Sequence, residues 1–298
     1  MKKSLLYFRF ALFFACMGCE DVIDVDVPSE EPRLVVEALI RVDLNEEFIP
    51  VEVKVSTTSG FFEKIPVTTL EQIDIIYEEH EDGAIINTGF SNLIEKEPGT
   101  GIYYPNPNFT TEQRISTRIL DRNWTFNLII QHEGRKYIAQ TKYVQAVPID
   151  DLVHGDDTLF GDDKTEVIIS FTDNPDRDDF YLFDFNFGEY LVTEDEFYNG
   201  QQFQFSYFYD QIFRSGRKID ISILGVDEGF YNYMDMLIEQ SGELQGPFQT
   251  PVATVRGNVF DITGLDNIDQ FDNAEQPNVF PLGYFAIVQE FKHTLTIK

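Results

Sequence analysis

Short runs of alternating apolar and polar residues recur along this chain, and they limit its possible folds more than any other feature. The runs in the first half lie at residues 34–40, 52–57, 72–77, 123–131 and 137–144. A period of two residues is typical of strands that bury one face, whereas helices repeat about every 3.6 residues. Since no helical period appears before residue 145, we predict that residues 33–146 form an N-terminal, immunoglobulin-like antiparallel β-sandwich.

A second set of strand-like runs follows residues 147–151 (VPIDD), whose composition is typical of a hinge or domain boundary. These runs lie at residues 166–172, 180–187, 203–208 and 218–224. One helix is predicted over about 228–241, because apolar residues recur at helical spacing, Asp227 can cap its start and Gly242 can end it. We therefore expect residues 147–298 to form a C-terminal β-sheet or barrel-like domain with one packed helix, in a mainly β chain of two antiparallel β-rich domains.

The segment PLGYF at residues 281–285 is typical of a structural turn. Gly283 has no Cβ, so it suits a position where another part of the backbone passes closely. We therefore interpret this segment as a structural turn.

The first 18 residues have the pattern of a bacterial lipoprotein signal peptide. Two lysines precede an apolar run, and Gly18 places a small residue directly before Cys19. Cleavage after Gly18 would leave Cys19 as the lipidated first residue, and its acyl chains would hold the protein on a membrane surface. Two alternatives stay open. Cys16 could be the lipidated residue, or the run could be an uncleaved span, although it is shorter than the ~20 residues that a span needs.

Both cysteines lie in this N-terminal region, so the mature chain is expected to have neither a disulfide nor a catalytic thiol. The 298-residue chain has a formal charge of −30, which becomes −33 when residues 1–18 are removed with their three basic residues. Nucleic-acid binding requires Lys and Arg that neutralise phosphates, so this balance excludes nucleic acid as a partner. Residues 19–32 are predicted to form an acidic tether.

Acidic loops offer weak candidates for a calcium site. The four candidate ligands follow a predicted strand in one loop: Asp173, Asp176, Asp178 and Asp179. Carboxylate oxygens are the ligands that Ca²⁺ prefers, but the spacing does not match the EF-hand pattern. A solvated acidic loop is the alternative, and we expect no cofactor.

The run at residues 203–208 extends into an aromatic row on one strand face. Its members are Phe203, Phe205, Tyr207 and Tyr209. An exposed row of this kind can stack on sugars or on the side chains of a peptide or protein partner, so it is a candidate ligand-binding site. The alternative is that the row fills the core, since the chain contains 28 Phe and 14 Tyr.

Motifs for catalysis do not appear in the sequence. It has no HExxH zinc motif, no G-x-S-x-G nucleophile turn and no phosphate-binding loop. The four histidines stand apart in the sequence: His80, His132, His154 and His293. We expect the protein not to be an enzyme, because catalysis would require a cleft with a carboxylate or His–carboxylate pair of shifted pKa, and nothing in the sequence selects one.

Several segments, taken together, resemble one bacterial family. They are residues 19–28 (CEDVIDVDVP), 32–37 (PRLVVE), 194–200 (EDEFYNG), 231–233 (YNY), 246–248 (GPF), 257–259 (GNV) and 282–285 (LGYF). In this order they resemble the Bacteroidota lipoprotein family catalogued as domain of unknown function 4249. The resemblance covers nearly the whole mature chain.

The resemblance implies a location and a partner. Members of the family resemble accessory surface lipoproteins, and their genes often lie beside those of TonB-dependent outer-membrane transporters. It also implies that acids just after the lipidated cysteine form a surface-export signal, which here would consist of Glu20, Asp21, Asp24 and Asp26. The alternative is that these acids only solvate a flexible tether.

From these features we expect a non-enzymatic lipoprotein that is anchored in the outer membrane through Cys19 and faces the cell exterior. The expected partner is a TonB-dependent transporter, which the protein would assist in nutrient capture or uptake. A structural or adhesive envelope lipoprotein without a transported ligand is the alternative. Recovery of a transporter with the protein would separate the two.

Overall fold

The computed structural model describes residues 31–59, 66–157, 164–241, 254–264 and 280–298. The strands are β1 (Leu34–Val42), β2 (Val53–Thr57), β3 (Gln72–Glu81), β4 (Ala84–Glu95), β5 (Ile102–Pro105), β6 (Trp124–His132), β7 (Arg135–Val144), β8 (Ile149–His154), β9 (Thr165–Thr172), β10 (Phe180–Asp184), β11 (Tyr190–Glu194), β12 (Gln202–Tyr209), β13 (Lys218–Val226), β14 (Val259–Asp261) and β15 (Leu282–Thr296). The helix α2 spans Glu228–Ser241, and a short 3₁₀ turn, η1, spans Thr117–Ile119. The prediction of a mainly β chain with one packed helix is confirmed for the described residues.

Eight strands form a closed, barrel-like sheet. Along the hydrogen-bonded ladder their order is β15-β1-β2-β5-β4-β3-β6-β7, and β7 pairs again with β15. Alternate apolar side chains point into the ring, where Val36, Ile75 and Phe126 are fully buried. In the runs with a two-residue period, the apolar side chains therefore face the inside of a barrel and the alternate side chains face its outside.

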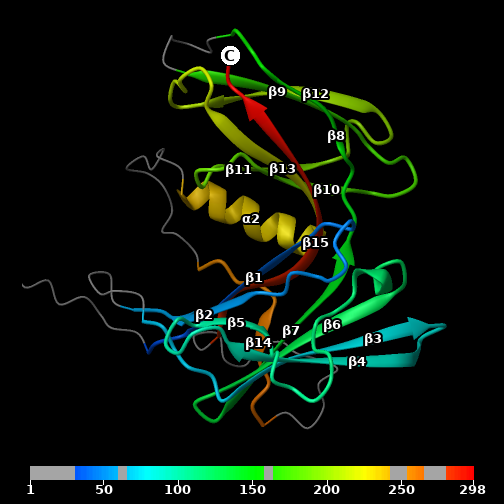
Figure 1. Cartoon of the computed structure of the whole chain (residues 1–298), viewed down its shortest axis with the longest axis vertical. Coiled ribbons are helices and arrows are strands. Elements are labelled where there is room, and N and C mark those ends of the chain that lie inside the picture. Colours follow the sequence, from blue (N-terminus) through cyan, green and yellow to red (C-terminus); the bar gives the residue numbers. More distant parts are fainter. Residues whose placement is uncertain (1–30, 60–65, 158–163, 242–253, 265–279) are drawn as a thin grey trace, which may run out of the picture. The chain divides into compact units, whose positions relative to one another are not determined.

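The last strand, β15, completes this ring and then leaves it. Its first half runs parallel to β1, and its second half runs antiparallel to β13 (Figure 1). The expectation of purely antiparallel sheets is therefore wrong at β15, which also pairs in parallel with β7. The immunoglobulin-like sandwich expected for residues 33–146 is not confirmed, because a strand from the far end of the chain closes the sheet that these residues begin.

Two smaller layers pack face to face beyond the barrel. One is the three-stranded sheet β12-β9-β8, and the other is the extension β11-β10-β13-β15 of the large sheet. Their shared core is rich in aromatic side chains, among them the fully buried Phe171, Tyr181 and Phe183. The boundary predicted near residue 147 stays a prediction, and β15 pairs with strands on both sides of it.

Helix α2 covers the opposite face of the β10-β13-β15 layer. Its start is capped as predicted, since the Asp227 carboxylate accepts a hydrogen bond from the Phe230 amide at 2.7 Å. Phe230 and Met234 pack against apolar side chains of this layer. The predicted stop at Gly242 lies outside the described residues.

The segment at residues 281–285 is not a turn, because β15 begins at Leu282 and continues without a break. Gly283 is paired with Val36 and has a φ of +96°. A Cβ at this position would lie 1.9 Å from the Val36 carbonyl oxygen. The close passage expected at Gly283 is thus present, inside a strand pair that closes the barrel.

Candidate functional site

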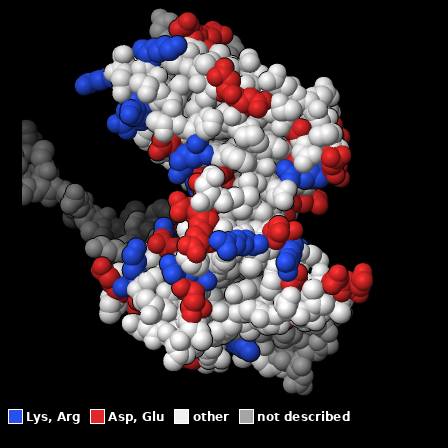
Figure 2. Space-filling view, turned by 45° about the vertical axis from the view of Figure 1, so that its right-hand side comes forward, with Lys and Arg blue, Asp and Glu red and all other residues white. Residues whose placement is uncertain are grey.

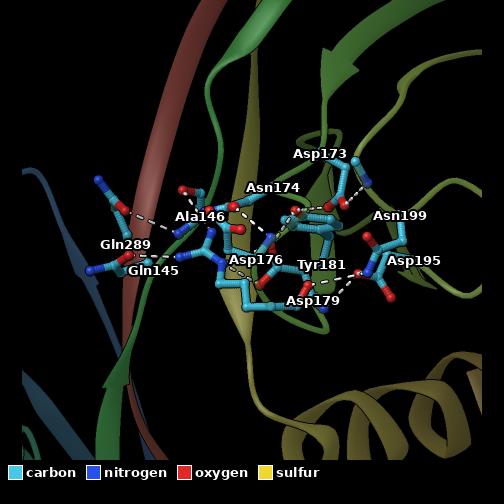
Figure 3. A network of polar contacts seen from close by, with 12 residues as sticks. Gln145, Ala146, Asp173, Asn174, Asp176, Asp179, Tyr181, Asp195, Asn199 and Gln289 are labelled. Carbon is cyan, nitrogen blue, oxygen red and sulfur yellow. Dashed lines mark hydrogen bonds and ion pairs between the residues drawn. The ribbon is translucent and has the colours of Figure 1, made fainter.

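A buried polar cluster joins the loop between β9 and β10 to the turn between β11 and β12 (Figure 3). We call it the Tyr181 network, and it consists of Asp173, Arg177, Asp179, Tyr181, Asp195 and Asn199. The loop follows β9 directly, and the turn follows β11, so the sandwich layers bring the two segments together. All four calcium candidates from the sequence lie in this loop.

Tyr181 lies at the centre of the network, with its hydroxyl oxygen 2.5 Å from Asp173 Oδ1 and 2.9 Å from Asp179 Oδ2. All three residues are almost completely buried. The Tyr181 hydroxyl has one hydrogen and donates it to only one of the two carboxyl groups at a time. The other carboxyl group forms a hydrogen bond with the hydroxyl oxygen only when it carries a proton to donate.

Burial fixes the direction of the pKa shifts in this group. Burial raises the pKa of Asp179, although hydrogen bonds from Arg177 and Tyr181 oppose this shift. Burial and the adjacent carboxylates of Asp173 and Asp179 raise the pKa of Tyr181 well above its ordinary value. The phenol is therefore neutral and acts as a donor, while Asp179 binds a proton more readily than an exposed aspartate.

Arg177 carries the network toward the barrel. Its Nε lies 2.7 Å from Asp179 Oδ1, and its Nη1 donates to Gln145 Oε1 at 2.6 Å. The backbone amide of Ala146, the next residue, donates to Gln289 Oε1 on β15 at 3.0 Å. The Tyr181 network is thereby connected to the segment between β7 and β8 and to the strand that closes the barrel.

Asp195 ties the other side of the network to the turn. Its Oδ2 accepts hydrogen bonds from the Asp179 amide at 2.9 Å and from Asn199 Nδ2 at 3.2 Å. The Gly200 amide donates to Asp173 Oδ2 at 2.8 Å. The turn and the loop therefore hold each other in place through charge-assisted hydrogen bonds, of which the bond from the Asp179 amide is buried and the other two are partly buried.

The chemistry available to this cluster is structural rather than catalytic. Tyr181 is fully buried, and the carboxylates of Asp173 and Asp179 are already occupied by the phenol, by Arg177 and by a backbone amide. A general acid or base must reach its substrate, and these groups are not accessible to one in this conformation. What the network does is fix two surface loops.

The structure does not bring the four calcium candidates together. Asp173 and Asp179 point into the network, whereas Asp176 and Asp178 are exposed. Arg177, in the middle of the same loop, supplies the positive charge that a cation would otherwise supply. Among the described residues, no three His, Cys, Asp or Glu side chains are grouped so that they could hold a metal ion.

The aromatic row of β12 faces the sandwich core and not an open surface. Its ring pairs are Phe203–Phe171, Phe205–Phe183, Tyr207–Phe185 and Tyr209–Phe185. Tyr209 is fully buried, and the other three side chains are partly buried. The core-filling alternative describes this arrangement, while a ligand-binding role for the row stays a prediction.

The N-terminal candidates lie outside the described residues: Cys19, Glu20, Asp21, Asp24 and Asp26. The four histidines lie on four different strands: His80 on β3, His132 on β6, His154 on β8 and His293 on β15. In the part of the chain that the structure describes, no helix has the length and apolar character needed to cross a bilayer.

Charged side chains pair across elements elsewhere on the molecule. Figure 2 shows acidic and basic side chains interspersed on one face, with broad uncharged areas between them. Arg41 on β1 lies 2.7 Å from Asp184 and 3.3 Å from Glu290, and so joins β1 to the end of β10 and to β15. Burial alone would lower the pKa of Arg41, but these two carboxylates raise it.

The sequence interpretation missed Tyr181, Asp195 and Asn199. The signals for two of them were present in the run at residues 194–200, because aspartate and asparagine before a glycine are typical of capped turns. The run was used only for family resemblance. Nothing in the local sequence marks Tyr181, which resembles any other inward-facing aromatic of β10.

Comparison with known proteins gives one finding and one absence. A family model described as "Domain of unknown function (DUF4249)" matches residues 20–265. The match begins directly after Cys19 and includes both segments of the Tyr181 network. A search of the curated proteins found no match to this sequence.

Proposed function

Because the chain belongs to the family of domain of unknown function 4249, we propose that it is a lipid-anchored accessory protein of the outer membrane. In this proposal it faces the cell exterior, has no enzymatic activity, and helps a TonB-dependent transporter to capture or admit a nutrient. The observation that supports the anchored location is the pattern of residues 1–18, which is typical of a lipoprotein signal peptide and places Gly18 directly before Cys19. The transporter as partner rests on the resemblance set out from the sequence.

The described residues favour binding over catalysis in two ways. Their most elaborate buried polar cluster, the Tyr181 network, has its functional groups occupied by one another. Its effect is to fix two surface loops, and preorganised loops lose little conformational freedom when a partner binds them. This favours a role in which the surface, and not a reactive centre, determines function.

Lipidation and partnership can be tested in one experiment on the full-length protein. Wild type and the variants Cys19→Ser and Cys16→Ser are labelled with a palmitate analogue in the native bacterium, and each is recovered from gently solubilised outer membranes. We expect the label and a TonB-dependent transporter with wild type and Cys16→Ser, and neither with Cys19→Ser. Loss of label in Cys16→Ser alone would show that Cys16, and not Cys19, bears the lipid. Recovery of the wild-type protein without a transporter would contradict the partnership.

The outer face of β4 favours the structural or adhesive alternative. Its exposed apolar side chains include Ile86, Phe90 and Ile94, which are 46%, 42% and 37% exposed. Phe109 extends this stripe, with its ring 6.1 Å from that of Phe90. Neighbouring exposed apolar side chains are typical of contact surfaces. If Phe90→Ser abolished attachment of cells to a surface while transporter recovery was unchanged, the adhesive role would be favoured.

A further inference from the structure

Phe197 is the most exposed large apolar side chain among the described residues, at 85% exposure. Its neighbours in the turn between β11 and β12 behave differently. Tyr198 is buried and stacks on Phe203 with ring centroids 4.5 Å apart, and Asp195 is buried in the Tyr181 network. The turn therefore holds two of its side chains in the fold and directs a phenylalanine into solvent.

The turn that displays Phe197 is fixed at both ends. At the start of the turn, the Asp195 carboxylate accepts a hydrogen bond from the Asp179 amide. At the end of the turn, the Gly200 amide donates a hydrogen bond to the Asp173 carboxylate. Gly200 has a φ of +69°, and a Cβ there would lie 2.7 Å from Pro175 in the facing loop. An exposed side chain on such a turn loses little conformational freedom when a partner binds it, which is the property of a preorganised anchor.

Exposed acidic side chains lie in the same turn as this phenylalanine and in the loop that packs against the turn. Glu196 precedes it in the turn, and Asp176 and Asp178 lie in the loop that packs against the turn. All three are exposed, and none forms an ion pair with another described residue. The carboxylates inside the network are paired, so the unpaired negative charge of this region lies on the exposed surface of the turn and of the loop that packs against it.

From this arrangement we propose that Phe197 inserts into an apolar pocket of a protein partner whose rim carries Lys or Arg. The proposal rests on the proposed function, and it commits to the TonB-dependent transporter as that partner. Charge complementarity supports a basic rim, since opposite charges around an apolar contact steer and orient binding. The same acidic side chains disfavour two other partners. One is a second copy of this chain, whose formal charge is −30, and the other is an anionic lipid surface.

The test compares three full-length proteins in native outer membranes: wild type, Phe197→Ala and the control Ile212→Ala. Ile212 is 63% exposed but lies in the connection between β12 and β13, away from the network. We expect the ratio of recovered transporter to lipoprotein to fall about tenfold or more for Phe197→Ala, as for a central anchor of an interface, and to stay unchanged for Ile212→Ala. Circular dichroism should show the same fold for all three, because neither side chain is buried.

A photoreactive phenylalanine analogue in place of Phe197 gives an independent readout. An adduct with the transporter supports the proposal. An adduct with another copy of this chain or with a different protein, or no adduct at all, overturns it. If wild type recovers the transporter and Phe197→Ala recovers it equally well, this inference fails while the proposed function stands; if wild type recovers none, the proposed function itself fails.

Discussion

Removing the Tyr181 hydroxyl should destabilise the fold more than removing the hydroxyl of a second, equally buried tyrosine. Tyr181 and Tyr209 are both fully buried. The Tyr209 hydroxyl donates to the backbone carbonyl of Phe185 at 2.7 Å. The Tyr181 hydroxyl instead lies between the carboxyl groups of Asp173 and Asp179. The two Tyr→Phe changes are therefore matched in size and burial, and differ in the charge of the acceptor.

The expected magnitudes follow from that difference. A hydrogen bond between neutral groups contributes about 1 kcal/mol to stability, and one to a charged group contributes about 1.5–3 kcal/mol. Asp173 would keep the Gly200 amide and Asp179 would keep Arg177, so neither becomes a fully unpaired buried charge. We expect a loss of about 1 kcal/mol for Tyr209→Phe and about 2–3 kcal/mol for Tyr181→Phe.

The assay is urea unfolding of the full chain in detergent at pH 7, followed by far-ultraviolet circular dichroism. A double-mutant cycle with Asp173→Asn adds the coupling between phenol and carboxylate, which should exceed about 0.5 kcal/mol for two residues in direct contact. A Tyr181→Phe loss no greater than that of Tyr209→Phe, together with zero coupling, would refute the idea that the phenol stabilises the buried carboxylates.

Three further outcomes are expected. Burial raises the folded-state pKa of Asp179 above its ordinary 3.8. Its contribution to stability is therefore present at low pH and is lost as the pH rises through the folded-state pKa. In urea titrations at stepped pH, the wild type should lose stability relative to Asp179→Asn over that interval. Gly283→Ala should cost several times more in melting temperature than Gly216→Ala, because both glycines have positive φ but only the first has a carbonyl 1.9 Å from the new Cβ. Trp124, the single tryptophan, lies in the barrel core. Its fluorescence and the circular dichroism of the whole chain should therefore change at one urea concentration. Two separate transitions would show that β15 does not couple the unfolding of the barrel to that of the smaller layers.

Several of the strands that the sequence predicted, such as β1 and β2, have a clear difference between their two faces. β4 was missed because the polarity of its side chains does not follow their burial: Phe90 and Ile94 face solvent, whereas Ser91 is fully buried. β15 was misinterpreted because Gly283 is typical of a turn when only local residues are considered. Its role as a strand depends on Val36, a partner at the other end of the chain, and local periodicity contains no information about such pairs.

The candidate site was predictable in part for a similar reason. The sequence offers the aspartate-rich loop as a weak candidate for a calcium site, with a solvated acidic loop as the alternative. Arg177, inside the same run, already provides the charge, and Tyr181 provides the donor. A pattern of residue types shows where charge is concentrated, but only the fold shows which charges are neutralised within the protein and which, such as Asp176 and Asp178, stay free.

The paired and the free charges should affect different rates of binding. The paired groups hold the turn rigid, so the partner would meet Phe197 in its bound position and little ordering would accompany association. Truncation of Phe197 should then act mainly on the dissociation rate, because it removes buried contact area from the complex. Neutralising Asp176 and Asp178 should instead lower the association rate and its dependence on salt, because those exposed charges act before contact. If both changes altered only the association rate, Phe197 would be part of the charged approach surface and not its anchor.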